Sequence, residues 1–129
     1  MDCLFCKIIE GEIPSYTIYE DEIAKVFLDI NPNTNGHCLI IPKKHIVTVD
    51  EVDEELASHI VTVEKQIHKL LKEKLNIAGL TICQNNNLGQ EVKHYHVHLI
   101  PRYKDDNWEI NFNQKSLNKT EDIYQKITN

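Results

Sequence analysis

Three histidines alternate with apolar residues in the segment HYHVHLI at residues 94–100. Side chains alternate between the two faces of a β-strand. The pattern therefore predicts that His94, His96 and His98 share one face and that the residues between them point into the core. The whole chain of 129 residues has seven histidines, so three at a strict period of two are hard to ascribe to chance.

Three histidines on one face of a strand could carry out two kinds of chemistry. In the first, one metal ion binds all three rings. The outer two Cα atoms would then lie about 13 Å apart on a strand, and convergence on one ion would need an awkward bend. In the second, the middle ring is a nucleophile and its neighbours hold the correct tautomer and supply protons. A free imidazole has a pKa of about 6.5 and is largely neutral at pH 7. We favour the second chemistry, with His96 as the nucleophile.

A C-x-x-C pair, Cys3 and Cys6, suggests a metal or redox site. Tetrahedral zinc would need two more ligands, and His45 is a candidate. Two alternatives remain. One is a pair of reduced cysteines in a short helix, and the other is a redox role, for which no thioredoxin-like βαβ pattern is visible. The remaining cysteines, Cys38 and Cys83, lie in apolar surroundings and are expected to be small core residues.

The elements that must position these residues are those of one α+β domain over residues 1–129. We expect a short helix at residues 3–10 and strands at 17–19, 24–28, 37–42, 80–83 and 91–103. The long helix begins after an N-cap at Asp53. It carries one apolar stripe and ends before Gly79. The stripe consists of Leu56, Ile60, Val63, Ile67, Leu70 and Leu71. Two histidines of this helix, His59 and His68, are expected to be ordinary surface residues.

Composition excludes several function classes. The net charge of −6 gives no general attraction to nucleic acid or to an anionic membrane. No apolar run approaches the roughly 20 residues of a membrane helix, and the N-terminus lacks a basic stretch followed by an apolar one. We expect a cytoplasmic protein that binds phosphate through a focused local site.

The histidine segment resembles the H-φ-H-φ-H-φ-φ motif of the histidine triad (HIT) family of nucleotide hydrolases and transferases. Four further segments resemble the family in the family's own order: residues 3–14, 27–30, 36–45 and 89–92. The resemblance covers residues 3–103, whereas the tail at 104–129 carries little of it. It is closest to the zinc-containing, bacterial-type branch. It implies an antiparallel sheet with one long helix and a short N-terminal helix, paired into a homodimer.

The resemblance also implies roles. His96 would attack the α-phosphate of a purine nucleotide and form a nucleotidyl-histidine intermediate, and His94, His98 and His37 would complete the histidine cluster. Asp29 would accept hydrogen bonds from the ribose hydroxyls. The slot for the base would be formed by Leu4, Phe5, Ile8, Ile13, Phe27 and Ile30.

Phosphate contacts are implied for Gln90, for the backbone near Val92 and for one asparagine of the preceding loop. This loop is a residue or two shorter than is usual in the family. Asn85, Asn86 and Asn87 therefore compete for the role, and we select Asn85.

The resemblance completes the metal site as well. Its ligands would be Cys3, Cys6, His45 and His94, which would hold one zinc ion per chain. Such a site is full and hence structural. It would tie the N-terminal segment to the catalytic strand.

Three functions are compatible with these residues. The first is hydrolysis of purine nucleoside phosphoramidates, related adenylated compounds or dinucleoside polyphosphates. The second is a nucleotide-binding module that regulates a partner with little turnover. The third is a zinc hydrolase that uses metal-bound water at the triad, which full coordination of the metal would oppose.

Overall fold

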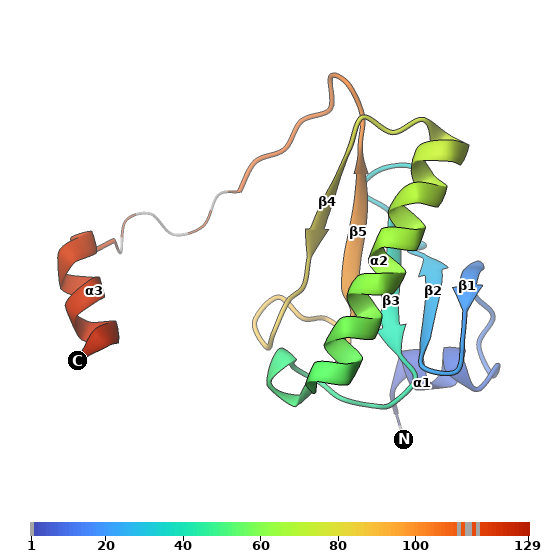
Figure 1. Ribbon diagram of the computed structural model, residues 1–129, viewed down its shortest axis with the longest axis horizontal. Helices are drawn as coiled ribbons and strands as arrows, with labels where there is room; N and C mark the ends of the chain where they lie inside the picture. The colour runs from blue at the N-terminus through green and yellow to red at the C-terminus, as the bar shows by residue number, and fades with distance from the viewer. Residues whose placement is uncertain (1, 111, 113–114, 116) are drawn as a thin grey trace.

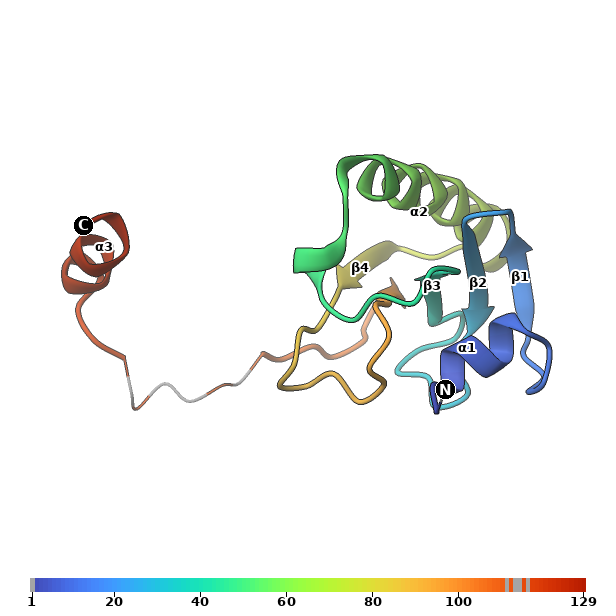
Figure 2. The same cartoon turned by 90° about the horizontal axis from the view of Figure 1, so that it is seen from below.

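The computed structural model describes residues 2–110, 112, 115 and 117–129. A five-stranded antiparallel sheet lies at the centre of the fold, in the order β1-β2-β3-β5-β4 (Figure 1). The strands are β1 (Thr17–Glu20), β2 (Ala24–Leu28), β3 (Cys38–Pro42), β4 (Gly79–Cys83) and β5 (Val97–Arg102). The long helix α2 (Glu54–Leu75) covers one face, and the short helix α1 (Leu4–Ile9) lies on the other (Figure 2). A 3₁₀ turn, η1 (Val49–Glu51), precedes α2. The predicted α+β class is confirmed.

Helix α2 begins where the sequence predicts. The side chain of Asp53 accepts a hydrogen bond of 2.8 Å from the backbone N–H of Leu56, which satisfies one of the otherwise unpaired donors of the first turn. Four residues of the predicted stripe are buried against the sheet, and these are Ile60, Val63, Ile67 and Leu71.

Helix α2 ends before Gly79, as predicted, but the glycine is not the residue that caps it. Asn76 caps it in the left-handed conformation, with φ of 53°, whereas Gly79 opens strand β4. Asparagine tolerates this conformation because its short polar side chain can bond locally. The helix therefore needs no glycine to stop.

Strand β3 supplies residues to both layers of the core. Cys38 and Ile40 pack under α2, whereas Leu39 and Ile41 face α1. All five residues of this strand are buried, as expected for a central strand covered on both faces. Strand β3 follows His37 directly and pairs with β5, the strand that carries His98, so its position sets where these histidines lie.

The histidine strand is shorter than predicted. Residues 91–103 were expected to be extended, but β5 starts at Val97, opposite Ile40 of β3. Before that point the backbone N–H of Tyr95 bonds to the carbonyl of Ile46 at 2.7 Å, outside the ladder. Two histidines of the triad therefore precede the strand. The alternation holds nevertheless, because Tyr95, Val97 and Leu99 all lie in the core under α2.

The two isolated cysteines have different environments. Cys38 is fully buried, as predicted, and burial raises the pKa of its thiol to about 12. Cys83 is exposed, so the prediction of a core residue is wrong there. It is the last residue of β4, at the edge of the sheet, where one flank of the strand lacks a neighbour among the described residues.

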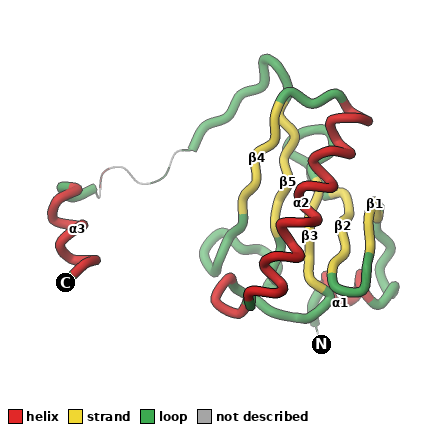
Figure 3. The backbone as a smooth tube through the Cα atoms, in the orientation of Figure 1, coloured by secondary structure: helices red, strands yellow, loops and turns green. Residues whose placement is uncertain are grey.

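The chain leaves the sheet after β5, and the tail ends in a further helix, α3 (Thr120–Thr128) (Figure 3). The guanidinium of Arg102 lies 5.3 Å from the ring centroid of Trp108, which anchors the start of the tail through a cation–π contact. Within the described part of the chain, none of the helices combines the length and apolarity that crossing a membrane requires.

Candidate active site

A cleft of about 510 Å³ opens on the α1 side of the sheet. Its apolar wall contains all six residues predicted to hold a base: Leu4, Phe5, Ile8, Ile13, Phe27 and Ile30. The rings of Phe5 and Phe27 meet edge to face, with centroids 5.5 Å apart. This is a favoured aromatic geometry, and it gives the wall a defined shape.

The ring of His96 lies in this cleft and is held by the main chain. Its Nδ1 is 2.7 Å from the carbonyl oxygen of His94. A carbonyl can only accept, so Nδ1 carries the proton and Nε2 keeps the lone pair. The ring packs against Phe5, with centroids 5.1 Å apart, and is only 5% exposed. Its orientation is therefore fixed.

A second pair of rings, His37 and His98, has its tautomers set in the same way. The backbone N–H of Asn33 donates to Nδ1 of His37 at 3.1 Å. The proton of neutral His37 is therefore on Nε2, which lies 2.9 Å from Nδ1 of His98. Since Nδ1 of His98 accepts, its Nε2–H remains to be offered to a ligand.

Burial keeps both of these rings uncharged. Desolvation, aided by the neighbouring His96 and His37, lowers the pKa of His98 to about 4, although Asp29 opposes the shift. Desolvation also lowers the pKa of His37, again against the effect of Asp29. Near pH 7 the pair therefore offers hydrogen-bonding dipoles rather than positive charges.

Four side chains from the N-terminal segment, the connection after β3 and the residues before β5 gather in a separate cluster. Cys3, Cys6, His45 and His94 place one potential ligand atom each within 4.8 Å of one another. Nδ1 of His94 lies 3.4 Å from Sγ of Cys3 and 3.6 Å from Sγ of Cys6. Nδ1 of His45 lies 3.3 Å from Sγ of Cys6 and 3.2 Å from Nδ1 of His94.

These spacings fit tetrahedral zinc. With Zn–S of about 2.3 Å and Zn–N of about 2.0–2.1 Å, a tetrahedron has N···N edges of about 3.3 Å and S···N edges of about 3.6 Å. Nε2 of His94 donates to the carbonyl of Pro42 at 2.8 Å. That bond leaves Nδ1 deprotonated and aimed at the cluster, which is the usual support of a histidine ligand.

The predicted phosphate contacts divide into two groups. Asn85 and Val92 line the cleft. Gln90 is buried instead, and its amide donates to the carbonyl of Val47 at 2.7 Å. Of the other two asparagines, Asn86 accepts from the backbone N–H of Val49 at 2.8 Å. Asn87 has a positive φ of 68°, and its backbone N–H donates to Oε1 of Gln90 at 3.1 Å.

Asp29 stands at the rim of the cleft, just beyond β2. One carboxylate oxygen accepts from the backbone N–H of Asn31 at 2.8 Å. The other lies 3.6 Å from Nε2 of His37. A carboxylate has about four acceptor positions, so capacity remains for a ligand.

Reasoning from the sequence missed the main-chain groups of this site. The N–H of Asn33 and the carbonyls of His94 and Pro42 fix three rings. Backbone groups occur in every residue and leave no signal in the sequence.

The comparisons with known proteins agree with this geometry. A family model described as the HIT domain matches residues 10–105. The chain belongs to the HIT domain family. A HIT-like protein from Methanocaldococcus jannaschii, MJ0866, is 44% identical over 128 residues, which is 97% of this chain and 98% of that protein. Adenosine 5'-monophosphoramidase HNT1 of Saccharomyces cerevisiae is 39% identical over 102 residues, which cover 78% of this chain and 62% of the yeast protein.

Solved structures of HIT proteins share the fold. A HIT family protein from Bacillus anthracis superposes with a TM-score of 0.83 at 39% identity, covering 98% of this chain and 92% of that one. A Zn-bound histidine triad family protein from Mycobacterium smegmatis gives a TM-score of 0.79 at 35% identity, with 88% and 84% covered.

Proposed function

We propose that this HIT protein hydrolyses purine nucleotides at the α-phosphate through a covalent nucleotidyl intermediate on His96. The observation that carries the proposal is the bond from Nδ1 of His96 to the carbonyl of His94, which leaves Nε2 as a free nucleophile inside an apolar-walled cleft. The yeast relative is named an adenosine 5'-monophosphoramidase, which supports this class of substrate. Dinucleoside polyphosphates are the second substrate class compatible with the cleft.

The first step forms a bond from Nε2 of His96 to the α-phosphorus. The bond from phosphorus to the leaving nitrogen or oxygen breaks, and the leaving group departs with the electron pair and takes a proton from water. The ring, now charged, keeps its Nδ1–H on the carbonyl of His94. Nε2–H of His98 donates to a phosphoryl oxygen, where a preorganised donor stabilises developing charge.

The second step reverses the first with water as the acceptor. A water oxygen attacks phosphorus, the N–P bond breaks, and its electron pair returns to Nε2 of His96. The proton that the water releases balances the one that the leaving group took. Imidazole suits both steps because it attacks and leaves well near neutral pH.

Recognition of the nucleotide follows from the walls of the cleft. The base would lie between Phe5 and Phe27, with the aliphatic residues around them, since flat apolar rings need few polar contacts. Asp29 would accept hydrogen bonds from the ribose hydroxyls. Asn85 and the backbone near Val92 would contact phosphate, whereas Gln90 would shape the loop that presents them.

We further propose that Cys3, Cys6, His45 and His94 hold one zinc ion. Four protein ligands leave no open position, so the metal would support the structure instead of activating water. This argues against a zinc hydrolase. The relative from M. smegmatis, which is Zn-bound, supports the assignment.

A homodimer is the expected assembly. The edge strand β4 and the exposed apolar side chains of Ile82 and Val61 support it, because paired edges are protected from promiscuous pairing. Sedimentation equilibrium should give twice the mass of 15.0 kDa, and a monomer at micromolar concentration would refute it.

Intact-protein mass spectrometry tests the reaction. We expect a transient adduct of one AMP after brief mixing with an adenosine phosphoramidate, present in the native chain and in His68→Ala but absent from His96→Ala. His96→Asn should still bind AMP without turnover. AMP binding by the native chain without an adduct and without release of product would favour the regulatory binding module instead.

A further inference from the structure

The loop between β2 and β3 carries a cleft residue at each end, Asp29 at its start and His37 at its finish. The backbone N–H of Asp29 bonds to the carbonyl of His37 at 2.9 Å, and the N–H of His37 bonds to the carbonyl of Thr34 at 3.1 Å. Inside the loop, the N–H of Asn33 donates to Nδ1 of His37. The conformation of the loop therefore decides which nitrogen of His37 carries the proton.

Two hydroxyl groups attach this loop to the end of β5. Oγ1 of Thr34 donates to the carbonyl of Pro101 at 2.7 Å, and the hydroxyl of Tyr103 donates to the carbonyl of Asn35 at 2.6 Å. Both partners are carbonyls, which only accept, so the direction of each bond is fixed. The two bonds enclose the stretch of loop that presents the N–H to His37.

Packing holds only one end of this stretch. Gly36 has a φ of 93°, and a Cβ built on it would lie 2.6 Å from Leu75 and 3.2 Å from Pro101, so the chain runs close to α2 and β5 there. By contrast, Asn33 and Asn35 are exposed and Thr34 is half-buried. Apolar burial therefore contributes little at residues 33–35, and the hydroxyl bonds fix their position.

The tautomer of His37 matters because it sets the tautomer of His98. If the N–H of Asn33 withdraws, the proton of His37 is free to move to Nδ1, and Nε2 becomes an acceptor. Nδ1 of His98, 2.9 Å away, must then carry the proton to keep the bond between the rings. Nε2 of His98 would present a lone pair, which repels a phosphoryl oxygen instead of donating to it.

We propose that Thr34, supported by Tyr103, is a positioning residue that holds the N–H of Asn33 on His37 and so keeps the proton of His98 on Nε2, where it serves the phosphoryl group. The contact of His98 with phosphate rests on the proposed function. The tautomers of the two rings in the ligand-free protein do not.

Thr34→Val tests this role in the full chain, because it keeps the shape of the side chain and removes the donor. Hydrogen exchange should show the Asn33 amide exchanging about 2–10-fold faster, which corresponds to one net hydrogen bond. Nitrogen NMR of the rings should show the tautomer ratio of His37 shifted by a similar factor toward Nδ1–H. The kcat for an adenosine phosphoramidate should fall about 2–10-fold with KM nearly unchanged, because the donor acts on charge that develops in the transition state.

Three further variants make the test specific. Thr62→Val is the matched control, since Oγ1 of Thr62 also donates to a carbonyl, that of Ser58 at 3.0 Å, but on α2; it should leave exchange, tautomers and kcat as in the native chain. Thr34→Ser retains the hydroxyl and should restore them, and Tyr103→Phe should shift them less than Thr34→Val does. Native exchange and tautomers in Thr34→Val, or an equal shift in Thr62→Val, would overturn the role of Thr34.

The ring spectra separate this inference from the proposed function, because they need no substrate. A tautomer shift in Thr34→Val, in a protein whose native chain forms no AMP adduct, would uphold the control of the rings by Thr34 and overturn the proposed function. An AMP adduct on His96, with Thr34→Val equal to the native chain in tautomers and kcat, would overturn the positioning role alone.

Discussion

At the scale of single residues, the main chain decides which nitrogen of each ring carries a proton. Three histidines each have one nitrogen bonded to a backbone group: His96 to a carbonyl, His94 to a carbonyl and His37 to an N–H. Each ring is thereby left with one defined atom for chemistry. The three rings are thus oriented before any ligand arrives, as their proposed roles as nucleophile, metal ligand and hydrogen-bond donor require.

One carboxylate outside the cleft gives a prediction at this scale. Asp21 accepts hydrogen bonds from Tyr19, His59 and the backbone N–H groups of Ile23 and Ala24. Desolvation alone would raise its pKa, but these bonds outweigh it and hold the pKa well below the usual range. Asp21→Asn should therefore cost about 1–3 kcal/mol of unfolding free energy at pH 7.

The sign of the pH dependence follows from the depressed pKa. Below the unfolded pKa of about 3.9 the unfolded chain binds the proton first, so this stabilisation fades as pH falls further toward the folded value. Urea unfolding at pH 7 and at decreasing pH below 4 should show the native and variant chains converging. Glu22→Gln, on the same turn but exposed, is the control; an equal loss there, or a loss in Asp21→Asn that grows in acid, would contradict the prediction.

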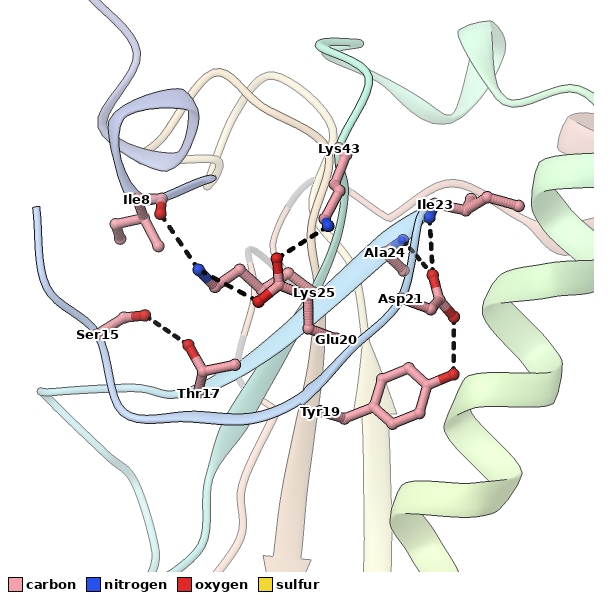
Figure 4. Close-up of polar contacts among 10 residues, drawn as sticks. All are labelled: Ile8, Ser15, Thr17, Tyr19, Glu20, Asp21, Ile23, Ala24, Lys25 and Lys43. Carbon is pink, nitrogen blue, oxygen red and sulfur yellow. Dashed lines mark hydrogen bonds and ion pairs between the residues drawn. The ribbon is translucent and has the colours of Figure 1, made fainter. Parts of the chain in front are cut away.

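At the scale of elements, a buried lysine joins α1 to the sheet. Lys25 of β2 is 8% exposed and donates through Nζ to the carbonyl of Ile8 at 3.2 Å (Figure 4). Glu20 of β1 lies 3.9 Å from the same Nζ and also pairs with Lys43 at 2.8 Å. The charged Nζ of Lys25 thus binds one carbonyl near the C-terminus of α1, the helix that forms part of the cleft wall.

Removing that charge should loosen α1. Lys25→Met keeps the length of the side chain but leaves the Ile8 carbonyl without this donor, so we expect a loss of about 1–3 kcal/mol in urea unfolding. Lys25→Arg should restore part of it. Lys43→Met removes only the outer ion pair to Glu20 and should lower the unfolding free energy less. A larger loss in Lys43→Met than in Lys25→Met would disprove that the bond from Lys25 to Ile8 holds α1 on the sheet.

Most elements could be predicted because their signals are local. The Asp53 cap and the stripe of α2 fix that helix, and alternation assigns Tyr95 to the core whether or not its segment is a strand. The start of β5 was not predictable, because it depends on where β3 offers a partner. The exposure of Cys83 likewise depends on strand order, which short-range patterns do not encode.

At the scale of the whole molecule, the Cys–His cluster joins segments far apart in sequence. It links α1, the connection after β3 and the approach to β5. Its four members could be anticipated from the resemblance of short motifs to the HIT family. The bonds that orient them involve backbone atoms brought together only by folding.

Zinc in this cluster should therefore stabilise the entire domain. A ligand present at a thousand times its dissociation constant contributes about 4 kcal/mol, which for a chain of this size corresponds to roughly 10–20 °C in the unfolding midpoint. We expect metal analysis to find one zinc per chain, and its removal by a chelator to lower the midpoint by that amount. Cys6→Ser should reproduce the loss and Cys83→Ser should not. Zinc-free protein with reduced thiols and an unchanged midpoint would contradict this.

Residue 94 combines two duties that mutation can separate. Its side chain belongs to the Cys–His cluster, whereas its carbonyl orients the ring of His96. The carbonyl belongs to the main chain and is present whichever residue occupies position 94. A substitution there therefore changes the side chain of the cluster and keeps the hydrogen-bond acceptor. A descendant of this chain could therefore replace the side chain at position 94, and with it the proposed metal site, without losing the acceptor that holds the ring of His96.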